Sequence, residues 1–393
     1  MTACHSLNGL DDKESWREVG LLTGGTDQQP FMQHVTTACH HCLEPACMEV
    51  CPTLAYEKDS LTGIVKHLDD QCFGCQYCIL ACPYNVPKYN SRLGIVRKCD
   101  LCSQRLKVGE PSACVQACPH EAIRISIVSI DQIESDCETS QFLPGTPDPQ
   151  YTLPTTNYRT SKPLPRNLIP ADYFRVQTEH SHVSLVTMLV LTQLAVGGMT
   201  LGTRLPESIR SIQYLVSMGF CYLALTASLM HLGRPWLAYR AILGLRRSWL
   251  SREILAFGVF SGAATFLTAR QIRPELVPDL GVSRSWLETI TVVSGLLGVY
   301  CSAMIYHRTK RPFWNVYQSG SRFLLTSTLL GLAVGWVSTL IGEVAFQISP
   351  GDEIVRMLKW GVLTAGVLKG ILEVGALVPL GDRPQTPLKR SAL

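Results

Sequence analysis

The stretch CFGCQYCILACP, residues 72–83, separates four cysteines by two, two and three residues and ends with a proline. Two related runs lie on either side of it. One is CHHCLEPACMEVCP at residues 39–52, and the other extends from CDLC at 99–102 to CVQACP at 114–119. Each run has three cysteines and then a fourth that directly precedes a proline. These runs are therefore expected to organise the first part of the chain.

This pattern is typical of ligands for cubane 4Fe–4S clusters, each of which needs four thiolates. In paired sites the close trio binds one cluster, and the fourth cysteine binds the neighbouring cluster. Proline suits the next position because its fixed φ fits the first turn of a helix. Structural zinc also uses Cys-x2-Cys pairs, but it takes two separate pairs and leaves the third cysteine and the proline unexplained. The runs thus predict iron–sulfur clusters.

The exchange of fourth ligands predicts which cysteines share a cluster. The expected sets are Cys39, Cys42, Cys47 with Cys82; Cys72, Cys75, Cys78 with Cys51; and Cys99, Cys102, Cys114 with Cys4. Cys118 then needs a trio that this chain does not show. If such a trio precedes Met1, then Met1 is internal and the clusters number four; otherwise three are complete and Cys118 is a spare thiol. His5, His40 and His41 adjoin ligands and are expected to be outer donors or surface residues.

The composition of the 393 residues divides the chain into two halves. Fourteen of the sixteen cysteines come before the long apolar stretches, and two come within them. The first thirty residues contain no apolar segment of a secretory signal, which favours a reducing compartment, where cysteines bind metals more often than they form disulfides. A net charge of +4 gives no indication of nucleic-acid binding.

The second half predicts a helical membrane domain. A membrane-spanning helix needs about 20 apolar residues. Five such stretches occur, near 183–203, 212–232, 252–270, 286–306 and 323–344, and a sixth near 355–379 is interrupted by Lys359, Lys369 and Glu373. The expected fold is therefore an α+β ferredoxin-like multi-cluster domain at 1–130, built as two βαβ units, followed by an all-α polytopic membrane domain at 176–393 with about six transmembrane helices.

Residues 131–175 form a Pro-rich linker between these domains. Its composition disfavours helices and sheet cores. Two interpretations remain open: a flexible tether, or a strap along the cluster domain or a partner, anchored by Tyr151 and Tyr158. Cys137 lies alone in the linker and is not an expected ligand.

The loops of the membrane half predict its orientation. The loops on the side of the cluster domain, 233–251 and 307–322, carry four basic residues each, whereas the opposite loops carry one or two each. The positive-inside rule then places the cluster domain in the cytoplasm and the protein in the inner (plasma) membrane as a multi-pass chain.

Two ionisable residues near span ends are candidates for a quinol site. His231 ends the second span and Glu253 begins the third, both on the cluster side. Oxidation of a quinol needs a proton acceptor for each hydroxyl, and His and Glu can serve. A histidine at a helix end is also commonly a capping or interfacial residue, so both interpretations stand. Glu343 and Glu373 are weaker candidates for proton conduction.

Both halves resemble subunits of the same enzymes. The runs at 39–52, 72–90 and 97–119 resemble the second, third and fourth cysteine groups of the four-cluster iron–sulfur subunit of dimethyl-sulfoxide-reductase-type enzymes, and TACHSLNG at 2–9 resembles the end of its first group. HLGRPWLAYRAILGLRRSWLSREI at 231–254 and IYHRTKRPFWN at 305–315 resemble the membrane anchor subunit. The family's first cysteine trio is missing here, and its anchor has eight spans rather than six, so the chain is expected to be a fragment at both ends.

This resemblance implies a role in electron transfer. His231 and Glu253 match the anchor residues implicated in quinol oxidation, with menaquinol as substrate from the membrane quinone pool. The clusters would pass electrons to a separate molybdopterin-containing catalytic subunit, so this chain would be a non-catalytic electron-transfer subunit. Two alternatives remain: reverse flow, as in quinone-reducing modules of hydrogenase or formate dehydrogenase, and a zinc-binding membrane scaffold.

Overall fold

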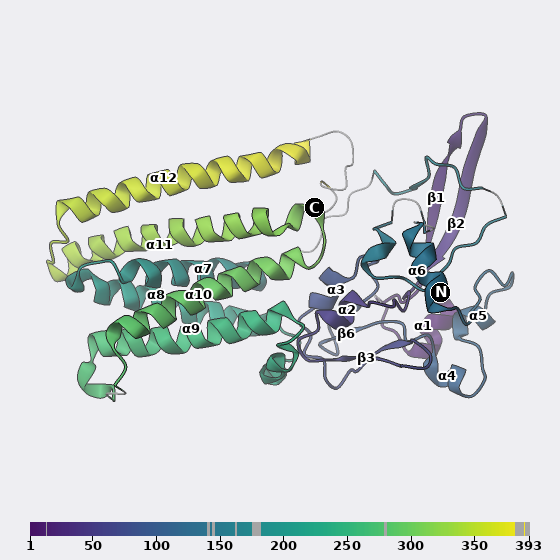
Figure 1. Ribbon diagram of the computed structural model, residues 1–393, viewed down its shortest axis with the longest axis horizontal. Coiled ribbons are helices and arrows are strands. Elements are labelled where there is room, and N and C mark those ends of the chain that lie inside the picture. Colours follow the sequence, from purple (N-terminus) through teal and green to yellow (C-terminus); the bar gives the residue numbers. More distant parts are fainter. Residues whose placement is uncertain are drawn as a thin grey trace. The chain divides into compact units, whose positions relative to one another are not determined.

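The computed structural model describes residues 1–12, 14–139, 142–143, 146–161, 163–174, 182–278, 281–381 and 389 (Figure 1). The chain divides into two compact units. The cysteine unit comprises Met1–Gln177 together with Trp236–Arg247, and the helical unit comprises Thr178–Pro235 and Ser248–Leu393.

The cysteine unit alternates cysteine runs with short antiparallel hairpins. Its elements are α1 (Thr2–Asn8), β1 (Glu18–Thr26), β2 (Gln29–Thr37), α2 (Ala46–Glu49), β3 (Tyr56–Lys58), β4 (Val65–His67), α3 (Tyr77–Ala81), β5 (Lys88–Asn90), β6 (Ile95–Arg97), α4 (Ser103–Lys107), α5 (Ala113–Gln116), α6 (Ile130–Glu138), η1 (Pro149–Tyr151) and β7 (Ile169–Pro170). The short helices α2 and α3 pack against each other. This arrangement of strands and small helices confirms the expected ferredoxin-like region.

The pairing of its strands differs from two βαβ units. Strand β3 pairs with β4, and β5 pairs with β6, so each strand pairs with its immediate neighbour in the chain. The two hairpins repeat one sequence pattern, DSLTGIVKH at 59–67 and NSRLGIVRK at 90–98. In both turns the glycine has a φ of 67° and its N–H donates over 2.9 Å to the carbonyl of the first residue. Glycine adopts this left-handed conformation without a steric penalty, so each hairpin closes locally.

The linker contributes contacts to the cysteine unit. The N–H of Leu43 donates to the carbonyl of Leu153 over 2.8 Å, and the N–H of Thr155 donates to that of His40 over 3.1 Å. Residues 152–156 are therefore a strap along the loop that carries Cys39 and Cys42. Helix α6 begins at Ile130, the last residue before the linker, and continues into the linker to Glu138, where we expected no helix. The hydroxyl of Ser129 caps it by accepting from the N–H of Gln132 over 3.3 Å.

A segment of the membrane half also folds with the cysteine unit. Residues 236–247, most of which lie in the 3-10 helix η2 (Pro235–Gly244), connect two long helices along the chain. The N–H of Gly244 donates to the carbonyl of Pro52 over 2.8 Å. A Cβ at Gly244 would lie 2.8 Å from that oxygen and 2.9 Å from the carbonyl oxygen of Cys51, so only glycine fits. The guanidinium of Arg240 donates to the carbonyl of Asp70 over 2.9 Å.

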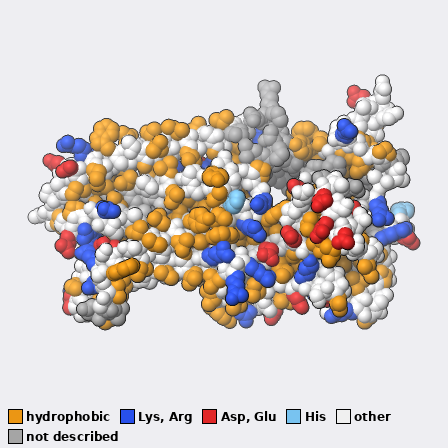
Figure 2. All heavy atoms as spheres, in the orientation of Figure 1, with side chains coloured by type: hydrophobic (Ala, Val, Ile, Leu, Met, Phe, Trp, Pro, Cys, Tyr) orange, Lys and Arg blue, Asp and Glu red, His pale blue; other side chains and the backbone are white. Residues whose placement is uncertain are grey.

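The helical unit consists of long apolar helices joined by short connections. They are α7 (Val183–Gly202), α8 (Glu207–Met230), α9 (Trp249–Ile272), α10 (Arg284–His307), α11 (Val316–Phe346) and α12 (Asp352–Leu377), with the 3-10 turns η3 (Pro274–Leu276), η4 (Pro312–Trp314) and η5 (Val378–Gly381). Within the described residues, six helices are long and apolar enough to cross a membrane. Figure 2 shows hydrophobic side chains spread over these helices, as expected for surfaces that face lipid. The expected all-α membrane domain is thus confirmed.

Small residues let two of these helices approach closely. Helices α7 and α11 pack together, and Gly197 of α7 lies directly against Gly331 of α11. A Cβ at Gly197 would lie 2.8 Å from the carbonyl carbon of Ser327 and 3.2 Å from the Cα of Gly331. Glycine is common at such crossings because membrane helices gain packing energy from close backbone contact.

We expect Gly197→Ala to destabilise the helical unit. The added methyl would push α7 from α11, and overpacking of this kind costs about 1–3 kcal/mol. Thermal unfolding of the detergent-solubilised protein should show a lower midpoint for Gly197→Ala. The matched control is Gly262→Ala in α9, because a Cβ there meets no atom within 4 Å. Equal midpoints for the two variants would contradict the close crossing.

Candidate functional site

Four cysteines from distant parts of the chain line one cavity in the cysteine unit. Cys39, Cys42 and Cys47 contribute from the first run and Cys82 from the second, together with Thr152 of the strap. This is one of the sets expected from the exchange of fourth ligands. Cys39 and Cys42 precede α2, Cys47 lies within it, and Cys82 directly follows α3. The packing of these two helices therefore brings the four cysteines around one cavity.

A second cavity contains the set that includes the first cysteine of the chain. Cys4 of α1 lines it together with Cys99, Cys102 and Cys114. Cys4 and Cys99 are both buried in a small apolar cluster with Leu10 and Trp16. The structure thus gives Cys4 the neighbours that the sequence predicted.

The remaining set surrounds the second run. Cys51 lies close enough to Cys75 and Cys78 for their charges to interact. The charge of Cys72 also interacts with those of Cys75 and Cys78. The backbone N–H of Ala55 donates to the sulfur of Cys51 over 3.3 Å. Each predicted set is therefore brought together in space, and ligation of one cluster by each set remains a prediction.

Cys118 belongs to none of the three sets. It is close to the surface, and the N–H of Ala122 donates to its sulfur over 3.2 Å. Backbone donors, led by that of Ile123, lower the pKa of the Cys118 thiol below its ordinary value. This nest of amides favours a thiolate, which is the form that binds metals.

The donor set fits iron–sulfur clusters. Of the twelve cysteines in the three sets, five are buried and seven are half-buried. Burial raises the pKa of Cys42 and of Cys99 to about 12, so bare thiolates are disfavoured there. Cys39 differs from these two. Burial raises its pKa as well, but Lys98 and then His41 outweigh that effect and bring it to about 6. Burial by itself would lower the pKa of Lys98. The negative charges of the surrounding cysteines outweigh this effect, so the pKa of Lys98 lies above its ordinary value. Buried thiolates of this kind need a cationic partner, which bound iron supplies.

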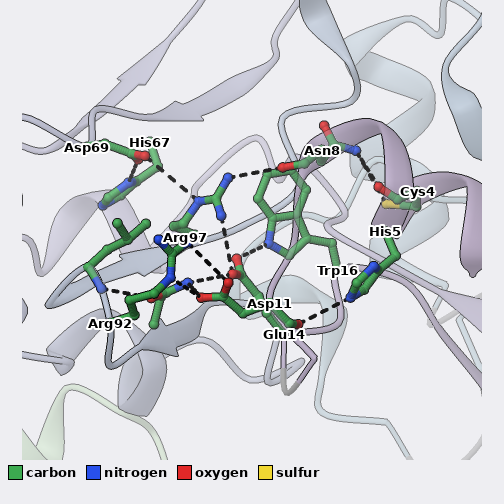
Figure 3. A network of polar contacts seen from close by, with 12 residues as sticks. Cys4, His5, Asn8, Asp11, Glu14, Trp16, His67, Asp69, Arg92 and Arg97 are labelled. Carbon is green, nitrogen blue, oxygen red and sulfur yellow. Dashed lines mark hydrogen bonds and ion pairs between the residues drawn. The ribbon is translucent and has the colours of Figure 1, made fainter.

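A polar network holds the segment after Cys4 in place (Figure 3). The buried carboxylate of Glu14 accepts from the indole N–H of Trp16 over 2.8 Å and from the amide of Asn90 over 3.0 Å. Arg97 pairs with Glu14 at 3.3 Å and lies over the Trp16 ring, 5.2 Å from its centroid. Since Trp16 packs in the apolar cluster of Cys4, this network fixes the wall of the second cavity.

The candidate quinol residues lie in the helical unit. His231 is the residue that ends α8, and its ring meets that of His182, before α7, edge to face with centroids 5.4 Å apart. Glu253 lies in the second turn of α9 and is 4% exposed. Its carboxylate accepts a hydrogen bond from the hydroxyl of Ser302 on α10.

His182 and Ser302 were not predicted from the sequence. His182 directly precedes the first apolar stretch, and a histidine at a membrane interface is a signal that could have identified it. Ser302 has no such signal, because a single serine in an apolar helix is ordinary. Only the packing of α9 against α10 reveals its contact with Glu253.

Comparison with known proteins gives two family matches. The 4Fe-4S dicluster domain matches residues 30–127, and the DMSO reductase anchor subunit (DmsC) matches residues 176–367. The first match supports iron–sulfur clusters over structural zinc. The second supports a multi-pass membrane protein.

Individual relatives agree with these matches. The protein is 32% identical over 169 residues to the B subunit of anaerobic dimethyl sulfoxide reductase from Haemophilus influenzae, covering 41% of this sequence and 81% of that subunit. It is 47% identical over 96 residues to the hydrogenase-2 operon protein HybA of Escherichia coli O157:H7, covering 23% of this sequence and 29% of HybA. It is 45% identical over 86 residues to the formate dehydrogenase iron-sulfur subunit of Haemophilus influenzae, covering 22% of this sequence and 28% of that subunit.

We expect Glu14→Ala to empty the second cavity. Removing one partner of a buried ion pair costs about 3–5 kcal/mol. Trp16 would also lose the hydrogen bond to Glu14 that positions it beside Cys4. Iron analysis of the purified protein should therefore show a loss of about four iron atoms per chain, the content of one 4Fe–4S cluster.

The matched control is Asp12→Ala, which removes a nearby but exposed carboxylate. It should retain the iron content of the unchanged protein. Full iron content in Glu14→Ala would mean that the network does not support the site.

Proposed function

We propose a substrate and a direction of electron flow for this chain, which belongs to the family of iron–sulfur subunits of dimethyl-sulfoxide-reductase-type complexes and carries the anchor subunit in the same polypeptide. It is an iron–sulfur electron-transfer subunit with a membrane anchor. In the proposal, it oxidises menaquinol in the membrane and relays the electrons through its 4Fe–4S clusters to a separate, molybdopterin-containing catalytic subunit.

One structural observation carries this proposal. Residues 236–247 fold with the cysteine unit, and along the chain they lie between α8, whose C-cap residue is His231, and α9, which contains Glu253. Gly244 in this segment bonds to Pro52, the neighbour of Cys51. The candidate proton acceptors are thus linked along the chain, through one short segment, to the neighbour of a candidate cluster ligand.

The chemistry divides between protons and electrons. Quinol oxidation releases two protons and two electrons. In the proposal, the His231 imidazole and the Glu253 carboxylate each accept one proton, and the Ser302 hydroxyl holds Glu253 in position. Iron–sulfur clusters, when bound, supply sites that accept one electron at a time. The cysteine sets bind and orient these groups, and the strap at residues 152–156 helps to exclude water from the first of them.

The cytoplasmic placement of the cysteine unit is part of the proposal. The loop at 233–251 carries four basic residues and contains the segment that folds with the cysteine unit. Basic loops favour the cytoplasmic side, so this supports a cytoplasmic cysteine unit in the plasma membrane.

Reverse flow is a second candidate function. It is favoured by the similarity to HybA and to the formate dehydrogenase iron-sulfur subunit, both of which exceed the dimethyl sulfoxide reductase relative in identity over shorter segments. In that case the same residues would donate protons to a quinone, and electrons would leave the cysteine unit for the membrane.

We expect His231→Arg to block quinol oxidation. The substitution removes a neutral base, and loss of such a group slows proton transfer by about 100-fold or more. The measurement is anaerobic bleaching of the iron–sulfur absorbance in membranes after addition of a menaquinol analogue. Reduction by dithionite should be unaffected, since it bypasses the quinol site.

The control is His34→Arg, which changes an exposed histidine in β2. It should bleach at the normal rate. Normal bleaching by quinol in His231→Arg would refute the assignment of the site. Rapid reoxidation of dithionite-reduced protein by a quinone analogue, with no bleaching by quinol, would instead support reverse flow.

A further inference from the structure

Lys98 is a buried cation between two of the cysteine sets. Its side chain is 3% exposed and extends from the residue after β6. The ammonium donates to the carbonyls of Val65 and Cys99, the latter over 2.9 Å, and to the sulfur of Cys39 over 3.6 Å. Cys39 belongs to the first set and Cys99 to the set of Cys4.

We propose that Lys98 is a positioning residue for electron transfer, which raises the reduction potential of the cluster held by Cys39, Cys42, Cys47 and Cys82 relative to its neighbours. The proposal deepens the relay function and rests on it. It concerns the fixed positive charge of the side chain and its hydrogen bond to sulfur.

No other nearby cation has this arrangement within the described residues. Lys58 donates to the carbonyl of Leu43 over 2.6 Å, and Lys88 pairs with Glu18 at 3.1 Å. Arg97 pairs with Glu14. In the part of the chain that the structure describes, Lys98 has no carboxylate partner, and its three acceptors are two carbonyls and a cysteine sulfur.

The absence of a carboxylate partner among the described residues points to the sulfur site as the counter-charge. A buried ammonium is costly unless an anion compensates it. Lys98 lines the same cavity as Cys39, Cys42, Cys47 and Cys82. The anionic group expected in this cavity is a thiolate-ligated cluster, so the buried cation and the bound cluster stabilise each other.

The effect on potential follows from charge. Reduction adds one electron to a cluster and hence one negative charge, with no bond made or broken. A cation at hydrogen-bond distance from a ligand sulfur stabilises the reduced form more than the oxidised form, and the surrounding low dielectric strengthens this difference. Hydrogen bonds to the sulfurs and net charge are among the factors that set such potentials. The cluster beside Lys98 is therefore where an electron in the relay resides most readily.

The test is a redox titration of the whole membrane-bound protein with chemical mediators, followed by electron paramagnetic resonance. Lys98→Met removes both the charge and the donor, and Lys98→Gln keeps a donor without the charge. In each, we expect one cluster midpoint to fall by about 59 mV or more, a tenfold change in its one-electron equilibrium. Lys98→Arg keeps the charge and should stay near the original midpoint.

Lys58→Met is the matched control, since Lys58 also donates to a carbonyl but has no hydrogen bond to a sulfur among the described residues. It should shift the midpoints clearly less than Lys98→Met does, because Lys58 is only half-buried, although its charge also acts on Cys42. Iron content is measured in every variant. A selective shift in Lys98→Gln at full iron content supports the proposal. If Lys98→Met loses iron, the proposal is tested by comparing the cluster midpoints of Lys98→Gln, which lacks the charge, and Lys98→Arg, which keeps it.

Unchanged midpoints in Lys98→Gln, or an equal shift in Lys98→Arg, would overturn the proposal and leave Lys98 a purely structural residue. Because the titration uses no quinol, its result is independent of the His231 experiment. Failure of the quinol site would appear in bleaching rates and not in these midpoints.

Discussion

The fold of the cysteine unit depends on one requirement: four sulfurs from distant segments must meet around each cavity. The predicted exchange of the fourth ligand makes this requirement stronger. Cys82 of the second run lies with the set of Cys39, and Cys51 of the first run lies with the set of Cys72. Each run is therefore tied to the other, and α2 packs on α3 because the two must face each other. Apart from the β1–β2 hairpin, α1 and α6, the strands of this unit have three residues or fewer and its α-helices have four or five, so it has little other regular structure to stabilise it.

The helical unit obeys a different constraint. Its helices are held by close backbone contacts at glycines and by a few buried polar pairs, of which Glu253 with Ser302 is one. A carboxylate is costly in an apolar environment, so the buried Glu253 is a candidate functional residue. The predicted cluster ligands organise the cysteine unit, whereas the close packing of helices organises the helical unit.

The sequence predicted those features that a repeated local chemistry encodes. Cysteine spacing anticipated which sulfurs come together, including Cys4, and hydropathy located the six long helices. It did not anticipate contacts that only tertiary packing creates. Gly244 gives no sign in the sequence that it will meet Pro52, and the Pro-rich strap only reveals its partners once its backbone groups meet those of His40 and Leu43. Helix α6 could have been found, since Ser129 is a standard capping residue before Ile133 and Cys137, the buried pair on one face.

The seating of residues 236–247 in the cysteine unit has a consequence for assembly. When an iron–sulfur subunit and an anchor are separate polypeptides, their association follows a concentration-dependent equilibrium. Here the connection is covalent, so the effective concentration of one for the other is set by the polypeptide itself, which for short linkers reaches the millimolar range. A small contact, such as one hydrogen bond from the backbone N–H of Gly244 and one from the guanidinium of Arg240, is then sufficient to keep the segment in place. Fusion also fixes the two parts in a one-to-one ratio at synthesis.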